Sequence, residues 1–401
     1  MNFDDFGFDG RISDALKRKG YTTPTPIQQQ AIPPALLGRD VLGLAQTGTG
    51  KTCAFAVPIL HKLAQSKHNR DSRKIKALIL SPTRELAMQI DESFKVYGRF
   101  LPFRTGLVMG GVGQDPQVKA LKAGVDILIA TPGRFIDLLY QSYIDPGFVE
   151  YFVLDEADRM LDMGFWPDVK RIIEFMPEKR QTLLFSATMP QEVKKLADKL
   201  LIEPALVSVT PASSTVERIK QIVYNTDKES KVDLLVWLLK NELFKTSTLI
   251  FTRTKYGADK LSRKLKNEGI RTAVIHGDKT QSARQNALRD FKHGVCKILV
   301  ATDIAARGID ISDISHVINY ELPNEPETYV HRIGRTGRAG KDGIAVSFCD
   351  CGEKAYLIDI EKLIKIRIEV AENNPYPMTV FEAADKKTKR SRPRRKRPST
   401  S

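Results

Sequence analysis

The sequence predicts an α/β protein with two domains, and two observations lead to that prediction. Short apolar runs alternate with helix-length segments, a rhythm typical of parallel sheets covered by helices on both faces. These runs lie at residues 41–45, 77–80, 126–130, 152–154, 182–185, 248–251, 272–275, 298–301, 317–320 and 344–348. The second observation is the length of 401 residues, because a single hydrophobic core rarely grows beyond roughly 250–300 residues.

The boundary between the two domains falls in a stretch where this rhythm stops. Residues 203–218 read EPALVSVTPASSTVER and are rich in proline, serine and threonine, which is typical of an interdomain linker. We therefore expect a first domain at 1–206, a linker at 207–216 and a second domain at 217–365. We expect residues 366–401 to form a basic, largely disordered tail.

The composition describes a soluble globular protein. Hydrophobic residues make up 42% of the chain and charged residues 28%, and no apolar run approaches the ~18 residues that would span a bilayer. The first ten residues, MNFDDFGFDG, are acidic and aromatic, unlike a secretory signal. The four cysteines lack zinc-site spacing, and we expect reduced thiols in a cytoplasm.

The net charge of +15 is concentrated near the C-terminus. From Asp385 onward nine lysines and arginines face one acid, which gives +8 and leaves +7 for the other 384 residues. Such a segment is expected to be disordered. We interpret it as an electrostatic arm for a polyanion, namely nucleic acid. A tail that only improves solubility is the alternative.

A phosphate-binding loop is predicted where the first apolar run ends. Residues 41–52 read VLGLAQTGTGKT, so a strand enters a glycine-rich loop and a helical pattern leaves it. Gly48 and Gly50 permit a tight turn whose backbone N–H groups surround phosphate oxygens. Lys51 then reaches the β- and γ-phosphates of a nucleotide, and Thr52 can ligate Mg²⁺. The general pattern begins with glycine, whereas this chain has Ala45.

Three acids follow the apolar run YFVL at residues 151–154. Asp155, Glu156 and Asp158 could simply cap the next helix, where carboxylates are favoured. In an open parallel sheet, however, ligands bind beyond the carboxyl ends of strands, and these acids leave such an end in the domain of the phosphate loop. We therefore expect Asp155 to hold Mg²⁺ and Glu156 to orient or deprotonate the attacking water.

These acids spell D-E-A-D, and the chain resembles the DEAD-box ATP-dependent RNA helicases over residues 3–340. The resemblance implies two tandem RecA-like domains, each a parallel sheet flanked by helices. Phrases such as QTGTGKT, DRMLDMGF and YVHRIGRTGRAG look most like the bacterial RhlE-type branch. The other ordered motifs are GYTTPTPIQ (20–28), PTRELA (82–87), Gly110-Gly111, TPGR (131–134), SAT (186–188), LIFTRT (249–254), ATDIAARGID (301–310) and HRIGRTGR (331–338).

The resemblance implies an ATP and Mg²⁺ site shared by both domains. Gln28 would read the adenine edge, since its amide donates and accepts. Tyr21 would stack on the base, although most relatives carry phenylalanine there and its hydroxyl is unexplained. The implied nucleotide-binding set is Phe3, Tyr21, Gln28, Gln46, Thr47, Gly48, Thr49, Gly50, Lys51, Thr52 and Asp310. The implied catalytic set is Lys51, Asp155, Glu156, Arg335 and Arg338, the two arginines acting as fingers; Thr52 and Asp155 would hold the metal.

RNA is the implied macromolecular partner. The implied RNA contacts are Thr83, Arg84, Gly110, Gly111, Thr131, Gly133, Arg134, Arg253, Gly277 and Thr302. Such small donors, glycines and arginines grip phosphates and 2′-hydroxyls and do not read base edges, so binding should ignore base sequence and weaken with salt. The residues implied to couple ATP state to RNA state are Asp158, Ser186, Thr188, His331 and Arg332.

The sequence therefore predicts an RNA-dependent ATPase that locally unwinds short duplexes. A related DNA-dependent translocase is one alternative, distinguished by its response to the 2′-hydroxyl. An ATP-gated RNA clamp or annealing chaperone is the other. We expect a cytoplasmic monomer without membrane association, acting on structured RNA, with ribosomal RNA or the RNA-decay machinery as candidate partners.

Overall fold

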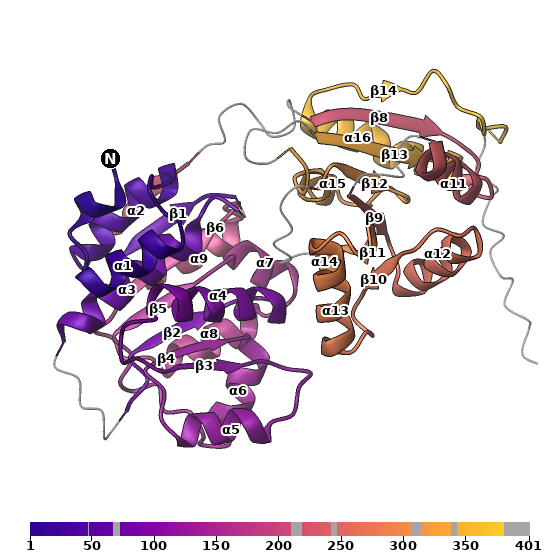
Figure 1. Ribbon diagram of the computed structural model, residues 1–401. Coiled ribbons are helices and arrows are strands. Elements are labelled where there is room, and N and C mark those ends of the chain that lie inside the picture. Colours follow the sequence, from indigo (N-terminus) through magenta and orange to yellow (C-terminus); the bar gives the residue numbers. More distant parts are fainter. Residues whose placement is uncertain are drawn as a thin grey trace, which may run out of the picture.

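Two α/β lobes make up the protein, with the first lobe preceding the second along the chain (Figure 1). The computed structural model describes residues 1–46, 48–66, 73–209, 219–241, 247–306, 314–337 and 343–380. Within these residues each lobe contains a seven-stranded sheet. The expected α/β class with two parallel-sheet domains is confirmed.

The first lobe alternates strands and helices as the apolar rhythm predicts. Its strands are β1 (Val41–Leu44), β2 (Ala77–Leu80), β3 (Thr105–Val108), β4 (Ile127–Ala130), β5 (Tyr151–Leu154), β6 (Gln181–Ser186) and β7 (Ala205–Ser208). Its helices are η1 (Phe3–Phe6), α1 (Gly10–Arg18), α2 (Pro26–Leu36), α3 (Lys51–Gln65), α4 (Arg84–Tyr97), α5 (Asp115–Lys122), α6 (Pro132–Tyr140), α7 (Ala157–Asp162), α8 (Trp166–Glu174) and α9 (Gln191–Leu200).

The second lobe repeats this organisation. Its strands are β8 (Ile219–Asn225), β9 (Thr248–Thr252), β10 (Ala273–Ile275), β11 (Ile298–Thr302), β12 (His316–Asn319), β13 (Gly343–Cys349) and β14 (Glu369–Val370). Its helices are α11 (Lys231–Asn241), α12 (Lys255–Asn267), α13 (Gln281–Lys292), α14 (Asp303–Ala306), α15 (Pro326–Ile333), η2 (Cys351–Glu353) and α16 (Lys354–Ile364).

The strand order positions the chemistry of the first lobe. The order is β3-β4-β2-β5-β6-β1-β7, and every pairing is parallel. Leu80 is in register with Leu154, and Leu44 is in register with Ser186, so the carboxyl ends lie at one edge of the sheet. The segments after β1, β6 and β5 are therefore neighbours in space although they are far apart in sequence.

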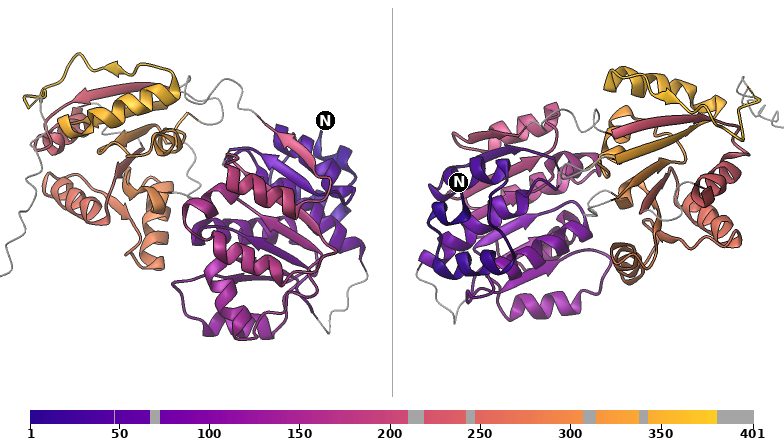
Figure 2. Two further views of the ribbon diagram at one scale, coloured as in Figure 1. Left: turned by 180° about the vertical axis from the view of Figure 1, so that it is seen from behind. Right: turned by 45° about the horizontal axis from the view of Figure 1, so that its top comes forward.

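The central strands are buried on both faces, as near-continuous Val/Ile/Leu runs require. Every residue of β2 and of β4 is buried. Ile79 packs into one apolar cluster together with Phe55, while Leu78 packs into a second cluster on the opposite face. Helices accordingly cover both faces of the sheet (Figure 2).

The end of the first lobe differs from the expected boundary. β7 pairs in parallel with β1, from Ala205 to Ser208, and Val207 is buried in the core. The first lobe thus includes residues that we expected in the linker, because an edge strand can add to β1 with alternate residues exposed. Residues 210–218, which hold most of that linker, lie outside the described residues.

The region after residue 365 also differs from the expected tail. β14 pairs with β8, and Ile368 and Met378 are buried. The backbone N–H groups of Thr379 and Val380 donate to the carboxylate of Asp227 at 3.0–3.1 Å. Residues 366–380 therefore belong to the second lobe, because their few apolar side chains are buried there, which composition alone does not reveal. Residues 381–401 lie outside the described residues.

Within the described ranges, no helix has the length and apolarity needed to traverse a bilayer.

We predict that a chain ending at residue 365 unfolds at lower temperature than a chain ending at residue 380. The shorter chain loses the buried side chains of Ile368 and Met378, each worth about 1.5–3 kcal/mol when fully buried. Calorimetry of both truncations and of the full chain measures this effect. The full chain and the chain ending at 380 should match, and equal transitions for all three would contradict the packing of 366–380.

Candidate nucleotide and RNA site

The phosphate loop follows β1 with the backbone geometry that its glycines allow. Gly48 and Gly50 have φ of 87° and 96°, in the left-handed region that favours glycine. Lys51 opens α3 and is only 5% exposed. Thr52 follows on the same helical turn and is half-buried. The loop thus presents a lysine and a hydroxyl at a helix N-terminus, where an anion is favoured.

Gln28 joins the segment at 20–28 to this loop. Its Oε1 accepts from the Thr25 N–H at 2.9 Å, and its Nε2 donates to the Gly50 carbonyl at 3.1 Å. Thr25 adds a hydrogen bond from its hydroxyl to the Thr49 carbonyl at 2.8 Å. A side chain at position 50 would overlap the Gln28 amide. The glutamine expected to read adenine is therefore also a support of the phosphate loop.

The aromatic residues assigned to the base pocket pack against each other. Phe3 is buried and meets the Tyr21 ring edge-on, with centroids 5.6 Å apart. The Tyr21 hydroxyl lies 3.0 Å from the Tyr97 hydroxyl on α4. This contact explains the hydroxyl that the sequence left unexplained, because tyrosine here ties the base pocket to α4.

The acidic motif lies beside the phosphate loop. Asp155 and Glu156 are each 3% exposed, and Lys51 Nζ lies 3.5 Å from Glu156 Oε1. Arg159, one turn into α7, forms an ion pair with the other oxygen of Glu156. Glu156 has φ of 57° and ψ of 53°, a left-handed conformation uncommon for a residue with a side chain and often found at functional sites. The carboxylates therefore face the loop and do not simply cap a helix.

Asp155 carries the unusual electrostatics of the site. Its Oδ1 is buried and has no hydrogen-bond partner among the described residues. Burial raises the pKa of Asp155 to about 7, with the nearby Lys51 opposing and Glu156 reinforcing the shift. A buried carboxylate oxygen without a hydrogen-bond partner, close to Lys51 of the phosphate loop, fits a hard cation such as Mg²⁺.

The residues assigned to coupling form a network between two neighbouring strands. Asp158 Oδ2 accepts from the Thr188 backbone N–H at 2.8 Å and from its hydroxyl at 2.9 Å. The Asp158 N–H donates to the Ser186 hydroxyl at 3.2 Å, which in turn donates to the Thr188 carbonyl at 2.6 Å. The segment after β6 is thus fixed to the acidic motif.

The RNA residues expected in the first lobe gather at the ends of three adjacent strands, β3, β4 and β2. Arg84 lies against Gly111, where an added Cβ would overlap its guanidinium. Arg134 Nη1 donates to the Val112 carbonyl at 3.3 Å, while Gly133 faces open space. Thr83 caps α4 by accepting from the Leu86 N–H. Thr131, buried before α6, and Gly110 complete this cluster.

The second lobe repeats the pattern on β10, β11 and β9. Gly277 follows β10 and faces open space, and Thr302 ends β11. Arg253 follows β9 but is engaged elsewhere, because its guanidinium forms an ion pair with Glu353 and stacks over Tyr356. Arg253, which we expected to contact RNA, is thus held by Glu353 and Tyr356 in this structure.

The residues expected to act across the lobes are described only in part. Arg332 is buried within the second lobe, where it pairs with Asp303 at 2.5 and 2.7 Å and donates to Asn319 at 3.1 Å. It thus supports the lobe and makes no direct contact with the acidic motif among the described residues. His331 is half-buried on α15, and Arg335 is buried just after it. Thr47, Asp310 and Arg338 lie outside the described residues.

The lobes touch through residues that sequence reasoning missed. Glu85, buried on α4, accepts from Gln281 Nε2 at 3.1 Å and pairs with Arg284 Nη2 at 3.0 Å, both on α13. Burial lowers the pKa of Arg284, which the Glu85 carboxylate opposes. The sequence does contain a signal for this contact between the lobes. Glu85 lies inside the motif PTRELA, and Gln281 and Arg284, which are three residues apart, share one helix face.

These features define the class of the protein as a two-lobed, RecA-like nucleotide-binding protein with a phosphate loop. Residues 25–196 match the family described as DEAD/DEAH box helicase. Residues 230–340 match the family described as Helicase conserved C-terminal domain. The two matches fall on the two lobes in order.

Similar proteins narrow the family assignment further. The chain is 42% identical over 367 residues to the ATP-dependent RNA helicase CshA of Listeria monocytogenes, covering 92% of this chain and 69% of that protein. It is 44% identical to the DEAD-box ATP-dependent RNA helicase 30 of Arabidopsis thaliana, covering 90% of this chain and 62% of the relative. The chain belongs to the DEAD-box RNA helicase family, and the expectation from its motifs is confirmed at that level.

Solved structures agree with this assignment. S. cerevisiae Dbp5 bound to RNA and ADP BeF3 is 33% identical, with a TM-score of 0.79, and the match covers 92% of this chain and 94% of that chain. Mss116p bound to ssRNA and AMP-PNP is 32% identical, with a TM-score of 0.81, over 93% of this chain and 79% of that chain.

We predict that Asp155→Asn stabilises the nucleotide-free protein more at about pH 8 than at about pH 4, because the stability loss due to Asp155 develops between its ordinary pKa and its raised pKa. Because its folded-state pKa of about 7 lies above the ordinary value of 3.8, Asp155 contributes stability that is lost as pH rises toward 7. Asparagine removes this loss, with a gain of roughly 1–3 kcal/mol above that pH. Thermal unfolding across the pH range measures it.

The same variant should lose the extra stability that Mg²⁺ with a nucleotide confers on the parent. Parallel pH curves for the two proteins would show that Asp155 is not the titrating group.

Proposed function

We propose that the chain is an RNA-dependent ATPase that opens short RNA duplexes locally. The observation that carries this proposal is the buried set of Lys51, Asp155 and Glu156 at the sheet edge, linked through Asp158 to Thr188. It is supported by relatives named ATP-dependent RNA helicases and by similar structures bound to RNA and nucleotide analogues.

Each residue of the nucleotide site has its own task in ATP hydrolysis. Lys51 reaches the terminal phosphates, and Glu156 orients the attacking water and accepts its proton. Thr52 and Asp155 would hold Mg²⁺, which when bound neutralises phosphate charge. No cluster of three or more His, Cys, Asp or Glu residues that could hold a metal ion occurs among the described residues, consistent with a cation that also takes phosphate and water ligands.

RNA is gripped along what we call the RNA track, the surface formed by Arg84, Gly111, Arg134, Gly277 and Thr302. These residues lie at or just after the carboxyl ends of adjacent strands in both lobes. They offer guanidinium groups, hydroxyls and open backbone, which suit phosphates and 2′-hydroxyls. RNA bound on this surface would span both lobes without reading base sequence.

Coupling follows from the order of the strands. The segment after β6 lies between the phosphate loop and the acidic motif, and Asp158 fixes Thr188 to that motif. ATP and RNA each bridge the lobes, so each favours their closure and increases the affinity for the other. A strand bent in the closed state no longer fits a duplex, and phosphate release would reopen the lobes.

We extend the proposal to a monomer of the bacterial RhlE-type branch acting in the cytoplasm. The phrases QTGTGKT and YVHRIGRTGRAG support the branch. The bacterial relatives support a bacterial protein, and free thiols at all four cysteines support the cytoplasm. Ribosome assembly and RNA decay are the candidate contexts for its structured RNA. The basic residues from Lys386 onward would act as an electrostatic arm for RNA.

We predict that Glu156→Gln retains ATP and RNA binding but slows hydrolysis at least 100-fold, since general-base catalysis contributes about 10²–10⁴. Glutamine preserves size and polarity but cannot take a proton from water. Single-turnover hydrolysis and fluorescence binding measure the two effects separately. Hydrolysis at the parental rate would remove the role assigned to Glu156.

We further predict that RNA stimulates the ATPase more strongly than DNA of equal length and sequence, because the RNA track recognises 2′-hydroxyls. Steady-state hydrolysis with each strand measures this, together with ATP-dependent release of a labelled strand from a short duplex. Equal stimulation would favour the DNA translocase, and annealing without strand release would favour the RNA clamp.

A further inference from the structure

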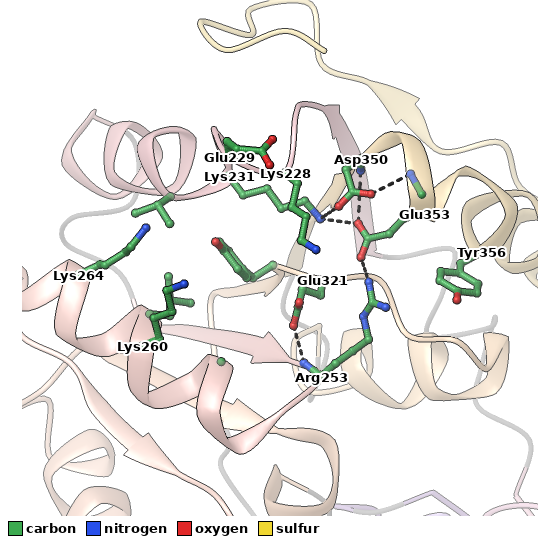
Figure 3. Close-up of a pocket in the computed structure, with 15 residues that line it drawn as sticks. Lys228, Glu229, Lys231, Arg253, Lys260, Lys264, Glu321, Asp350, Glu353 and Tyr356 are labelled. Atoms are coloured by element: carbon green, nitrogen blue, oxygen red, sulfur yellow. Dashed lines mark hydrogen bonds and ion pairs between the residues drawn. The ribbon is translucent and has the colours of Figure 1, made fainter. Parts of the chain in front are cut away.

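A polar cavity opens on the second lobe, away from the nucleotide site (Figure 3). Its volume is about 730 Å³, and it is lined by residues at the carboxyl ends of β9, β12 and β13 together with α11, α12 and α16. Val232 and Leu261 are its only aliphatic lining residues. Nine of the fifteen lining residues are charged, so ionic groups dominate the lining of the cavity.

The floor of the cavity is a buried ionic network. Lys231 is buried and pairs with Asp350 at 2.9 Å and also with Glu353. Glu353 additionally pairs with Arg253 and accepts from the Leu322 N–H at 3.2 Å. The two acids of the floor, Asp350 and Glu353, are thus matched by the cations Lys231 and Arg253.

The rim carries the unmatched charge. Lys228, Lys260 and Lys264 are exposed, and none of them forms an ion pair within the described part of the chain. Figure 3 shows Lys260 and Lys264 on one helix and Lys228 across the cavity from them. Glu321 accepts from the Arg253 N–H at 2.8 Å, and Glu229 is the remaining acid. The five cations exceed the four acids, and the excess lies at the lysine rim.

Helix α12 separates this cavity from the RNA track. Its first turn lies beside Gly277, because Lys255 pairs with Asp278 at 2.7 Å and Asp259 pairs with Lys279 at 2.9 Å. The opposite side of the same helix presents Lys260 and Lys264 to the cavity. A strand leaving the track over α12 would therefore meet these lysines next.

The C-terminal segment meets the other side of the cavity. Thr379 and Val380 are held at Asp227, the residue before Lys228. The chain continues from there into its most basic stretch. In the second lobe, the RNA track is thus followed by the lysines at the cavity rim. These are followed in turn by Val380, where the described C-terminal segment ends.

We propose that the cavity binds phosphate groups of the RNA strand that extends beyond the RNA track. This inference rests on the proposed function and names where flanking RNA is held. Exposed lysines above a buried ionic network suit phosphates in any sequence. The site adds affinity for RNA longer than the track without touching the nucleotide.

The test compares Lys260→Ala/Lys264→Ala with a matched control, Lys195→Ala/Lys199→Ala. The control pair has the same spacing on α9 of the first lobe and also lines a cavity. Fluorescence anisotropy in a salt series measures affinity for two RNAs with ATP analogue present, one filling only the track and one with a single-stranded flank. ATPase stimulated by the short RNA is measured in parallel.

We expect the Lys260/Lys264 variant to lose about 2- to 30-fold in affinity for the flanked RNA, the range for two exposed ion pairs. Its salt slope should fall by about 1.4, at about 0.7 per lost phosphate contact. Affinity for the short RNA, its ATPase and both control values should stay at parental levels. Parental affinity and slope for the flanked RNA, or equal losses for both RNAs, would overturn the inference.

Measurements on the parental protein distinguish failure of this inference from failure of the proposed function. If short RNA does not stimulate the parental ATPase, the proposed function fails, and the inference falls with it. If stimulation is present and the flank adds no affinity through Lys260 and Lys264, the inference alone fails.

Discussion

The site depends on one interaction, the buried contact between Lys51 and Glu156 at the carboxyl edge of the first sheet. Charges in a low-dielectric interior must be matched, because an uncompensated buried charge costs several kcal/mol. Here Arg159 completes the match for Glu156, whereas Asp155 retains an unpartnered oxygen. The unpartnered oxygen of Asp155 close to Lys51 therefore favours a ligand that brings both phosphate and a cation.

The strand order places the contact between Lys51 and Glu156 next to other functional segments of the molecule. Because β6 lies between β1 and β5, whatever changes at the phosphates is next to Ser186 and Thr188. Both lobes carry their expected RNA residues on three adjacent strands, and Glu85 on α4 meets Arg284 on α13 between them. A parallel sheet thus gives each lobe one functional edge, and the contact between α4 and α13 joins the two lobes.

Several side chains have more than one task, and this limits what can be exchanged. Gln28 supports Gly50 as well as the expected base pocket, and Tyr21 binds Tyr97 through its hydroxyl. Arg332 stabilises the second lobe through Asp303. Such residues would couple loss of stability to loss of activity, whereas Lys260 and Lys264 at the cavity rim form no ion pair within the described part of the chain.

The sequence by itself determined the α/β class, the two lobes, the phosphate loop and the acidic motif, because local periodicity and short-range spacing encode them. It did not determine that residues 366–380 pack on β8, that Arg253 binds Glu353, or that Glu85 meets Arg284. Those contacts join segments at least 100 residues apart. Only the folded chain decides them, because partner choice over such separations follows from strand order and packing.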